Sequence, residues 1–154
     1  PAFAGPAARR GLPATPFHRR RIWHTPSAEA RRLTDPVSDH RLLGFREGNE
    51  PGRWSRLLDT ALEPWPADHR FLGRPVLPAA AMLEMALAAG NARHWDAPAL
   101  EARDFAILHA LPLDAEQRPR ELRADLDEDG AFALRSRARL SDEPWTLHAT
   151  GRVS

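Results

Sequence analysis

The chain has 154 residues, 42% of them hydrophobic, which is enough for one folded domain or for one domain with an extended arm. Its 22 basic residues, all arginine, nearly balance 21 acidic residues, and the formal net charge of +1 argues against nucleic-acid binding. The absence of cysteine excludes disulfides and thiolate metal sites and fits a cytoplasmic protein. No apolar run is long enough for a membrane segment. No two histidines have the helical spacing of a zinc site.

Residues 1–37 differ from the rest of the chain because closely spaced prolines and glycines leave no room for a long helix. Within them, residues 12–23 (LPATPFHRRRIW) bring aromatic and arginine side chains together. We interpret this segment as an extended arm held on a neighbouring surface, because the basic run at 18–21 is too short to neutralise many phosphates. The first residue is not methionine, which indicates a piece of a longer polypeptide. The predicted domains are an arm at residues 1–37 and a folded domain at residues 38–154.

The folded domain is predicted to begin with short extended elements. Residues 39–44 (DHRLLG) lead to a stretch of apolar and small residues at 54–61, which we predict to be a half-buried strand. The sequence Glu-Pro-Trp-Pro at 63–66 ends this strand, because proline cannot continue a ladder of hydrogen bonds. Residues 74–77 are long enough only for a second, brief strand.

The most informative stretch is residues 68–78 (DHRFLGRPVLP), which contains His69, Gly73 and Pro78. Residues 79–90 follow directly and carry a single charged side chain. A helix that is apolar on nearly every face is expected to be buried on nearly every face. The stretch therefore places a titratable imidazole and a bare glycine backbone just before a helix that the rest of the domain surrounds.

The predicted helix starts after Pro78 and ends at Gly90-Asn91, both of which are common stop residues. Its one charged residue, Glu84, is expected either to face solvent at a gap in the surrounding sheet or to meet an arginine. Four large side chains of this helix are predicted to form the core beneath the sheet: Met82, Leu83, Met85 and Leu87.

The remainder of the chain predicts an antiparallel sheet. A strand is expected at 100–108. A hairpin is expected next, because apolar and polar residues alternate at 122–126 and again at 132–134. The turn between these two strands is Asp127-Glu128-Asp129-Gly130. Ala138 and Leu140 are predicted to continue the inward face, and a last strand starts near Trp145. One apolar helix followed by antiparallel strands indicates the α+β class.

These motifs resemble the N-terminal hot-dog half of a polyketide synthase dehydratase domain. The spacing of His69, Gly73 and Pro78 matches the HxxxGxxxxP motif of that family, and 145–151 (WTLHATG) is similar to the closing strand of its first hot-dog. DHRLLG resembles the family's HPLLG, and 12–23 resembles the linker that follows an acyltransferase domain. The resemblance covers most of residues 10–153 and implies a hot-dog fold, an antiparallel sheet wrapped around one helix, as one half of a double hot-dog.

The resemblance also implies a reaction: removal of water from a 3-hydroxyacyl thioester to give a 2-enoyl thioester. This elimination needs a base for the α-proton, an acid for the hydroxyl group and polarisation of the thioester carbonyl. An imidazole suits the base because it is mostly neutral near pH 7 yet can accept a proton. Glycine lets a backbone N–H approach a substrate carbonyl, because it has no side chain in the way. The positive end at the start of a helix favours an oxyanion. By this resemblance His69 is the base, Gly73 contacts the carbonyl and Pro78 shapes the turn into the helix.

In this family the acid is an aspartate of the second hot-dog. We assign that role to no residue of this chain, because no aspartate here has the family's sequence context. The aspartates considered are Asp104, Asp114, Asp125 and Asp142. The implied partners are an acyl carrier protein, whose phosphopantetheine arm carries the substrate, the second hot-dog half and the neighbouring synthase domains. No cofactor of the chain's own is expected, and homodimerisation is left open.

Two alternatives remain at this stage. The first is a catalytically silent hot-dog that acts as a structural or docking module within the synthase. Two departures from the family pattern, Arg41 in place of proline and Ala79 in place of glycine, fit that alternative or a changed substrate. The second is a free-standing thioesterase or hydratase that works as a homodimer, which would need a carboxylate within this chain. The other histidines of the folded domain are interpreted as structural: His40, His94, His109 and His148.

Overall fold

The computed structural model of the chain describes residues 38–47, 50–113 and 118–154. The predicted arm at 1–37, with its linker-like segment at 12–23, and Asp114 lie outside the described residues. In chain order the elements are β1 (Phe45–Arg46), β2 (Arg53–Leu58), the 3-10 helix η1 (Trp65–Asp68), β3 (Arg70–Phe71), β4 (Arg74–Pro75), α2 (Ala79–Arg93), β5 (Ala102–Ile107), β6 (Arg120–Leu126), β7 (Ala131–Ala138) and β8 (Thr146–Val153).

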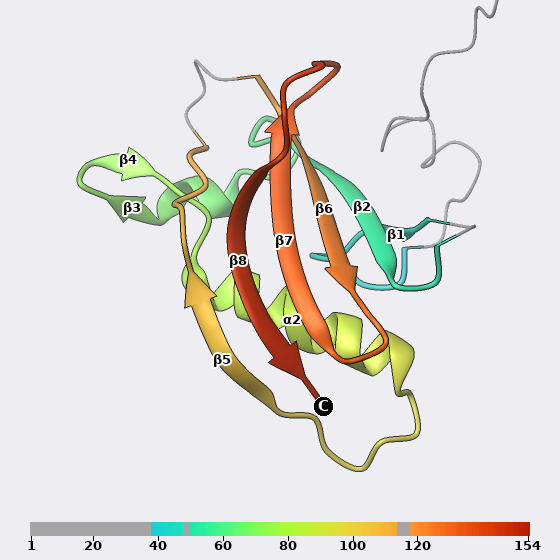
Figure 1. The fold of residues 1–154 in the computed structure, drawn as a ribbon. Coiled ribbons are helices and arrows are strands. Elements are labelled where there is room, and N and C mark those ends of the chain that lie inside the picture. Colours follow the sequence, from blue (N-terminus) through green and yellow to red (C-terminus); the bar gives the residue numbers. More distant parts are fainter. Residues whose placement is uncertain (1–37, 48–49, 114–117) are drawn as a thin grey trace, which may run out of the picture.

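Six strands form one antiparallel sheet in the order β1-β2-β6-β7-β8-β5, and α2 lies in its concave face (Figure 1). The two remaining strands, β3 and β4, form a separate hairpin that projects from the sheet beside the start of α2. One helix wrapped by an antiparallel sheet is the predicted hot-dog arrangement. None of the helices that the structure describes is both long and apolar enough to cross a membrane.

The helix begins where the sequence predicts and ends two residues beyond the predicted stop at Gly90-Asn91. Pro78 is its N-cap, with φ −58° and ψ 143°, and Arg93 is its last residue. Gly90 does not stop the helix but lies inside it, facing β8. A Cβ atom at Gly90 would lie 2.5 Å from Cγ1 of Val153, so glycine is needed there for close packing between helix and sheet.

The core lies between α2 and the sheet. Met82 and Met85 are each 1% exposed, and they pack with apolar side chains from β2, β6, β7 and β8. The opposite side of the helix is open among the described residues, where Ala79, Ala80 and Glu84 are exposed. Leu83 is 36% exposed, so its prediction as a core residue is wrong. The sheet covers one side of the helix only. Leu83 lies three and four residues after the exposed Ala80 and Ala79, and residues at this spacing share one side of a helix.

The β6–β7 hairpin confirms the predicted turn. Asp127 N–H donates to the carbonyl of Ala131, and Gly130 adopts φ +79°, a conformation that glycine takes without strain. The predicted inward position of Leu140 is wrong, because β7 ends at Ala138 and Leu140, with φ +53°, is 65% exposed. The predicted strand at 54–61 is shorter, because Asp59 starts a turn after Leu58.

Candidate functional site

His69 lies in the loop that joins η1 to the β3–β4 hairpin, directly before the segment that enters α2. It is the C-cap of η1, with an extended backbone at φ −82° and ψ 119°. Pro64 and Pro66 favour the tight 3-10 turn upstream, because each fixes φ near the helical value. The short helix thus ends at His69, and the residue itself is exposed.

A backbone carbonyl fixes the His69 ring. Nδ1 lies 3.1 Å from the carbonyl oxygen of Val76, while Val76 N–H donates to the carbonyl of His69 over 3.0 Å. A carbonyl oxygen can only accept, so Nδ1 of the neutral ring carries the proton and Nε2 carries the lone pair. The ring is therefore held in the tautomer in which Nε2 can accept a proton.

Gly73 lies at the tip of the β3–β4 hairpin. Leu72 and Gly73 both have positive φ, +50° and +79°, as the two central residues of a type I′ turn do. A Cβ atom at Gly73 would meet no atom within 4 Å, so the space around this backbone is open. Its carbonyl accepts a hydrogen bond from Arg70. The predicted contact between Gly73 N–H and a substrate carbonyl stays a prediction.

Pro78 is the N-cap of α2, and its predicted place among the substrate-binding residues stays a prediction. Its carbonyl accepts the first helical hydrogen bonds, from Ala81 N–H at 3.0 Å and Met82 N–H at 3.3 Å. The first N–H groups of a helix lack partners within the helix and lie at the positive end of its dipole. Ala79 is exposed at this helix start, so its methyl group adds bulk on the open side.

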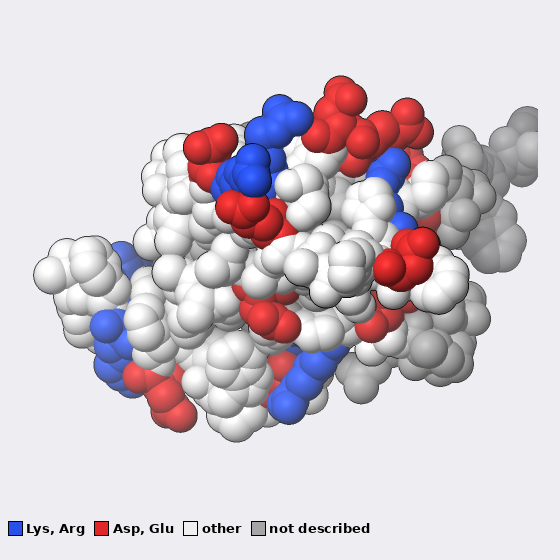
Figure 2. Space-filling model, turned by 90° about the horizontal axis from the view of Figure 1, so that it is seen from below, with Lys and Arg blue, Asp and Glu red and all other residues white. Residues whose placement is uncertain are grey.

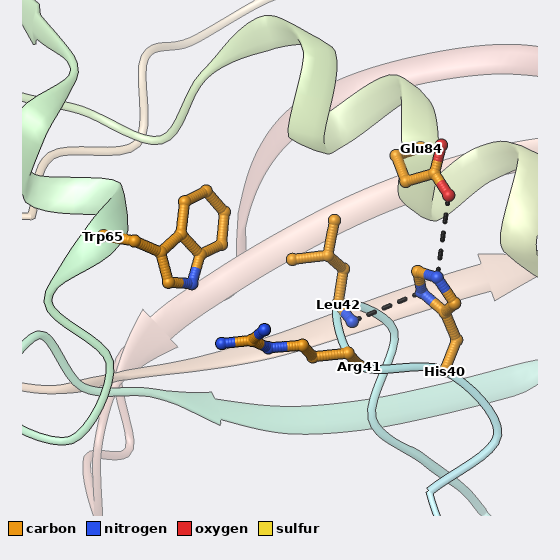
Figure 3. Close-up of a pocket in the computed structure, with 5 residues that line it drawn as sticks. All are labelled: His40, Arg41, Leu42, Trp65 and Glu84. Atoms are coloured by element: carbon orange, nitrogen blue, oxygen red, sulfur yellow. Dashed lines mark hydrogen bonds and ion pairs between the residues drawn. The ribbon is translucent and has the colours of Figure 1, made fainter.

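A pocket of ≈ 420 Å³ lies on the open side of α2 (Figure 3). Trp65 of η1, Glu84 of α2 and the segment His40-Arg41-Leu42 line it. Trp65 starts η1, the short helix whose C-cap is His69, but His69 is not among the residues that line this pocket. Its lining residues come from both sides of the His69 motif in the sequence.

Glu84 pairs with a histidine, which the sequence did not predict. Its Oε1 lies 3.6 Å from Nε2 of His40, and Leu42 N–H donates to Nδ1 of the same ring over 3.3 Å (Figure 3). An N–H donor at Nδ1 makes that nitrogen an acceptor, so Nε2 of the neutral ring carries the proton toward Glu84. The one signal for this pair was the presence of a single charge in an otherwise apolar helix.

The surface outside the pocket carries both acidic and basic side chains (Figure 2). On the face shown in Figure 2, acidic and basic side chains are both present and neither covers the face. Asp125, one of the aspartates considered above, is bound by Arg53 and Arg135 at 2.6 Å and 2.7 Å. It alternates along β6 with the buried Ala124 and Leu126 and so points away from the helix side.

Comparison with known proteins decides the family. Residues 40–145, which contain the His69 loop, α2 and most of the sheet, match the family described as "Polyketide synthase dehydratase domain". The chain belongs to the polyketide synthase dehydratase family. The matched range includes His69, Gly73 and Pro78 in the arrangement described above.

Several dehydratase relatives are large synthases. The chain is 31% identical to a phenolphthiocerol/phthiocerol polyketide synthase of Mycobacterium tuberculosis, over 92% of this chain and 8% of that protein. It is 36% identical to the spectinabilin polyketide synthase system protein NorA' of Streptomyces orinoci, over 93% of this chain and 4% of that protein. The chain therefore spans less than a tenth of either relative.

Solved dehydratase structures share the fold. GphF dehydratase 1 matches with a TM-score of 0.64 and 30% identity, over 75% of this chain and 44% of that chain. The bifunctional dehydratase-cyclase domain of ambruticin biosynthesis matches with a TM-score of 0.59 and 32% identity, again over 44% of that chain. This chain thus corresponds to a half of such a dehydratase, which confirms the predicted hot-dog half.

Proposed function

We propose that this chain supplies the base-bearing half of a dehydratase that removes water from a 3-hydroxyacyl thioester on an acyl carrier protein. The observation that carries the proposal is the contact between Nδ1 of His69 and the carbonyl of Val76. It leaves Nε2 as the nitrogen that can take up a proton, in an exposed loop at the start of a helix. The chain's membership of a polyketide synthase dehydratase family supports the substrate class.

In the proposed reaction, Nε2 of His69 takes the proton from the carbon next to the thioester carbonyl. The electron pair of that C–H bond forms the new carbon–carbon double bond, and the C–O bond at the third carbon breaks. The leaving hydroxyl group takes a proton from an acid, so that one water and one 2-enoyl thioester are formed. Proton transfer to a well-placed base contributes about 10²- to 10⁴-fold to such rates.

Charge that develops on the thioester oxygen needs hydrogen-bond donors. The first N–H groups of α2 have no partner within the helix and lie at the positive end of its dipole, directly after Pro78. We propose that they face the thioester oxygen. We propose that Gly73 N–H adds a further donor, because no side chain at that residue limits the approach of a substrate. The phosphopantetheine arm of the carrier protein would deliver the thioester to these groups.

We propose that the acid comes from a second hot-dog that packs on the open side of α2. The dehydratase chains of known structure are more than twice as long as the part this chain matches. Two surfaces favour such a neighbour: the exposed Ala79, Ala80 and Leu83 on the helix, and the edge of the sheet at β5, where Ile107 and Leu108 are 47% and 49% exposed. Neighbouring synthase domains and a cytoplasmic location stay predictions.

The decisive experiment uses the complete polypeptide that contains this chain. Its carrier protein is loaded with 3-hydroxyacyl chains of several lengths and both hydroxyl configurations, and loss of water is followed by mass spectrometry. We expect dehydration by the wild type, loss of dehydration in His69→Ala, and no change in His94→Ala, which alters an exposed histidine at the far end of α2. Dehydration by His69→Ala at the wild-type rate would contradict the assignment of the base.

The same experiment tests the alternative of a silent structural module. Ala79, which adds a methyl group beside the helix start, favours that alternative. In that case no substrate loses water with either the wild type or the variants. Replacement of Ala79 by glycine would then show whether the methyl group blocks access, since it removes only that group.

A further inference from the structure

The proposed reaction does not use His148, which is a buried titratable side chain on β8. It is 2% exposed, and both ring nitrogens have partners. Nδ1 lies 3.1 Å from the carbonyl oxygen of His109, and Nε2 lies 2.7 Å from Oγ of Ser136. Because the carbonyl can only accept, Nδ1 carries the proton and Nε2 accepts from the Ser136 hydroxyl. The neutral ring is thus fixed from two sides.

Ser136 is itself held in place. It is 0% exposed, and its Oγ accepts hydrogen bonds from Nε and Nη2 of Arg120 at 3.3 Å and 3.1 Å. With its lone pairs engaged by the guanidinium, the hydroxyl group directs its own proton to His148. Three side chains from neighbouring strands β6, β7 and β8 therefore form one fully directed chain of hydrogen bonds.

A β-bulge puts the His148 side chain in this place. Leu134 pairs with Ala149 and Arg135 pairs with Leu147, so β8 carries one extra residue, His148, opposite β7. An extra residue breaks the alternation of a strand and redirects its side chain. For this reason His148 and Ala149 are both buried, although they are neighbours in a strand.

His148 fixes the segment that follows β5. Besides the bond from its side chain to His109, its carbonyl accepts from Leu108 N–H at 2.8 Å and from His109 N–H at 3.3 Å. The His109 ring lies 2.9 Å from the carbonyl of Leu147. Residue 109 is therefore bound through its N–H, its carbonyl and its side chain to two consecutive residues of β8, which lies beside β5 (Figure 1).

The same segment holds the backbone that fixes the candidate base. Leu77 N–H donates to the carbonyl of Leu111, and Leu113 N–H donates to the carbonyl of Pro75, both over 2.9 Å. These two bonds flank Val76, whose carbonyl binds Nδ1 of His69. Leu111 and Leu113 are 0% and 5% exposed, so burial holds this segment as well.

We propose that His148 is a positioning residue for His69. Through His109 and the segment 111–113 it holds the Val76 carbonyl in place, and that carbonyl sets the orientation and the tautomer of the His69 ring. The inference rests on the proposed function only where it treats His69 as the base. Its structural part concerns the His69 ring and is measurable without any turnover.

The test compares two replacements of His148 in the complete polypeptide. His148→Asn keeps an N–H donor near the place of Nδ1, whereas His148→Leu removes the donor and fills similar space. Exchange of the imidazole C2 hydrogen with deuterium, followed by mass spectrometry across pH, reports on the His69 ring alone. Amide exchange of the peptides that contain 75–77 and 108–113 reports on the backbone between the two histidines.

In His148→Leu we expect faster amide exchange in both segments and a shifted pH midpoint for His69 C2 exchange. We also expect kcat for dehydration to fall by about 10- to 100-fold with KM nearly unchanged, the size typical of a group that orients a reacting side chain. His148→Asn should restore the exchange behaviour and most of kcat. Ser136→Ala, which removes the partner of Nε2, should give changes of the same kind and serves if the leucine variant does not fold.

Val153→Ala is the matched control, because Val153 is 2% exposed and lies at the other end of β8, where it pairs with Ala102 of β5. If His148→Leu leaves His69 exchange as in the wild type, or if Val153→Ala shifts it equally, the proposal is wrong. If the wild type does not dehydrate any substrate, the proposed function fails, while the exchange data still decide whether His148 holds the His69 ring.

Discussion

Nδ1 of His69 and the carbonyl oxygen of Val76 are 3.1 Å apart, and this contact determines which ring nitrogen can act as a base. Val76 is separated from His69 by the β3–β4 hairpin, whose strands pair Arg70 with Pro75. The hairpin folds the chain back so that residue 76 meets residue 69. The spacing between His69 and Pro78 therefore has a structural reason, since it leaves room for one hairpin and one backbone contact before the helix begins.

His69→Asn should separate the contact with Val76 from the chemistry. The asparagine amide can still donate to the Val76 carbonyl, but it offers no basic nitrogen in the place of Nε2. We expect dehydration to fall by about 10²- to 10⁴-fold. Amide exchange of the hairpin should stay unchanged, because the bond that holds the ring is retained. Residual activity within a few-fold of the wild type would mean that another group removes the proton.

Leu72→Asn should stabilise the hairpin. Leu72 has φ +50°, which is unfavourable for a branched side chain, and it is 87% exposed, so its replacement loses almost no packing. Asn-Gly is a preferred pair for a turn with two positive φ values. We expect amide exchange in the peptide that contains 70–76 to become slower, because the free energy of local opening should rise by up to about 1 kcal/mol. Faster exchange would show that the leucine makes a contact with a neighbour.

Arg56 ties the segment before β1 to β2, and its replacement should loosen both. It is 5% exposed, and its guanidinium donates to the carbonyls of Arg41 and Leu42, at 2.7 Å and 3.2 Å, and to Glu63 at 2.5 Å. A lysine carries one compact ammonium group and cannot reach all three acceptors. We expect Arg56→Lys to lower the free energy of unfolding by about 1–3 kcal/mol, measured by amide exchange of β2 peptides.

Glu63→Gln tests the ionic part of the same contact. It keeps an acceptor oxygen but leaves the buried guanidinium without its counter-charge, so part of the loss in Arg56→Lys should appear. The matched control is Glu101→Gln at the exposed pair with Arg103, where solvent screens the charges and no measurable change is expected. Equal effects at the two sites would contradict the importance of burial.

The sequence was sufficient for the fold class, the start of the helix and the β6–β7 hairpin, because each depends on local signals. Proline fixes the helix start, apolar alternation marks β6 and β7, and the Asp-rich turn with Gly130 joins them. His69, Gly73 and Pro78 were selected because they match the motif of a family that the sequence resembles, and their roles stay predictions. The Val76 carbonyl could not be selected from the sequence, because any residue can supply a carbonyl and only the hairpin register brings it to His69.

The incorrect predictions arise from tertiary packing. Gly90 reads as a helix stop but lies inside α2, where β8 comes too close for a side chain. Leu83 is apolar but lies on the side of α2 that the described sheet leaves uncovered. The burial of His148 was not predicted in either direction, because it follows from a bulge and no local pattern in a strand shows where an extra residue will fall. Such features depend on which strands meet and in which register.

His148 should also make the stability of the sheet depend on pH. Burial lowers the pKa of His148, the charge of Arg120 lowers it further, and hydrogen bonds to the backbone at His109 and Ala110 only partly oppose this. The unfolded chain binds a proton near pH 6.5, the ordinary value for histidine, whereas the folded chain does so only at lower pH. The contribution of the neutral ring to stability is therefore complete above about pH 7.

As the pH falls below about 6.5, the free energy of unfolding should decrease by at most about 1.4 kcal/mol per pH unit for this group, until the lowered pKa is reached. Amide exchange of β8 peptides, corrected for the intrinsic pH dependence of exchange, measures this loss between about pH 7.5 and about pH 5. His148→Asn has no titratable ring and keeps His40, His69 and His109, so its β8 stability should vary less over the same interval. An identical pH dependence in the two proteins would show that His148 is protonated equally in the folded and unfolded chain.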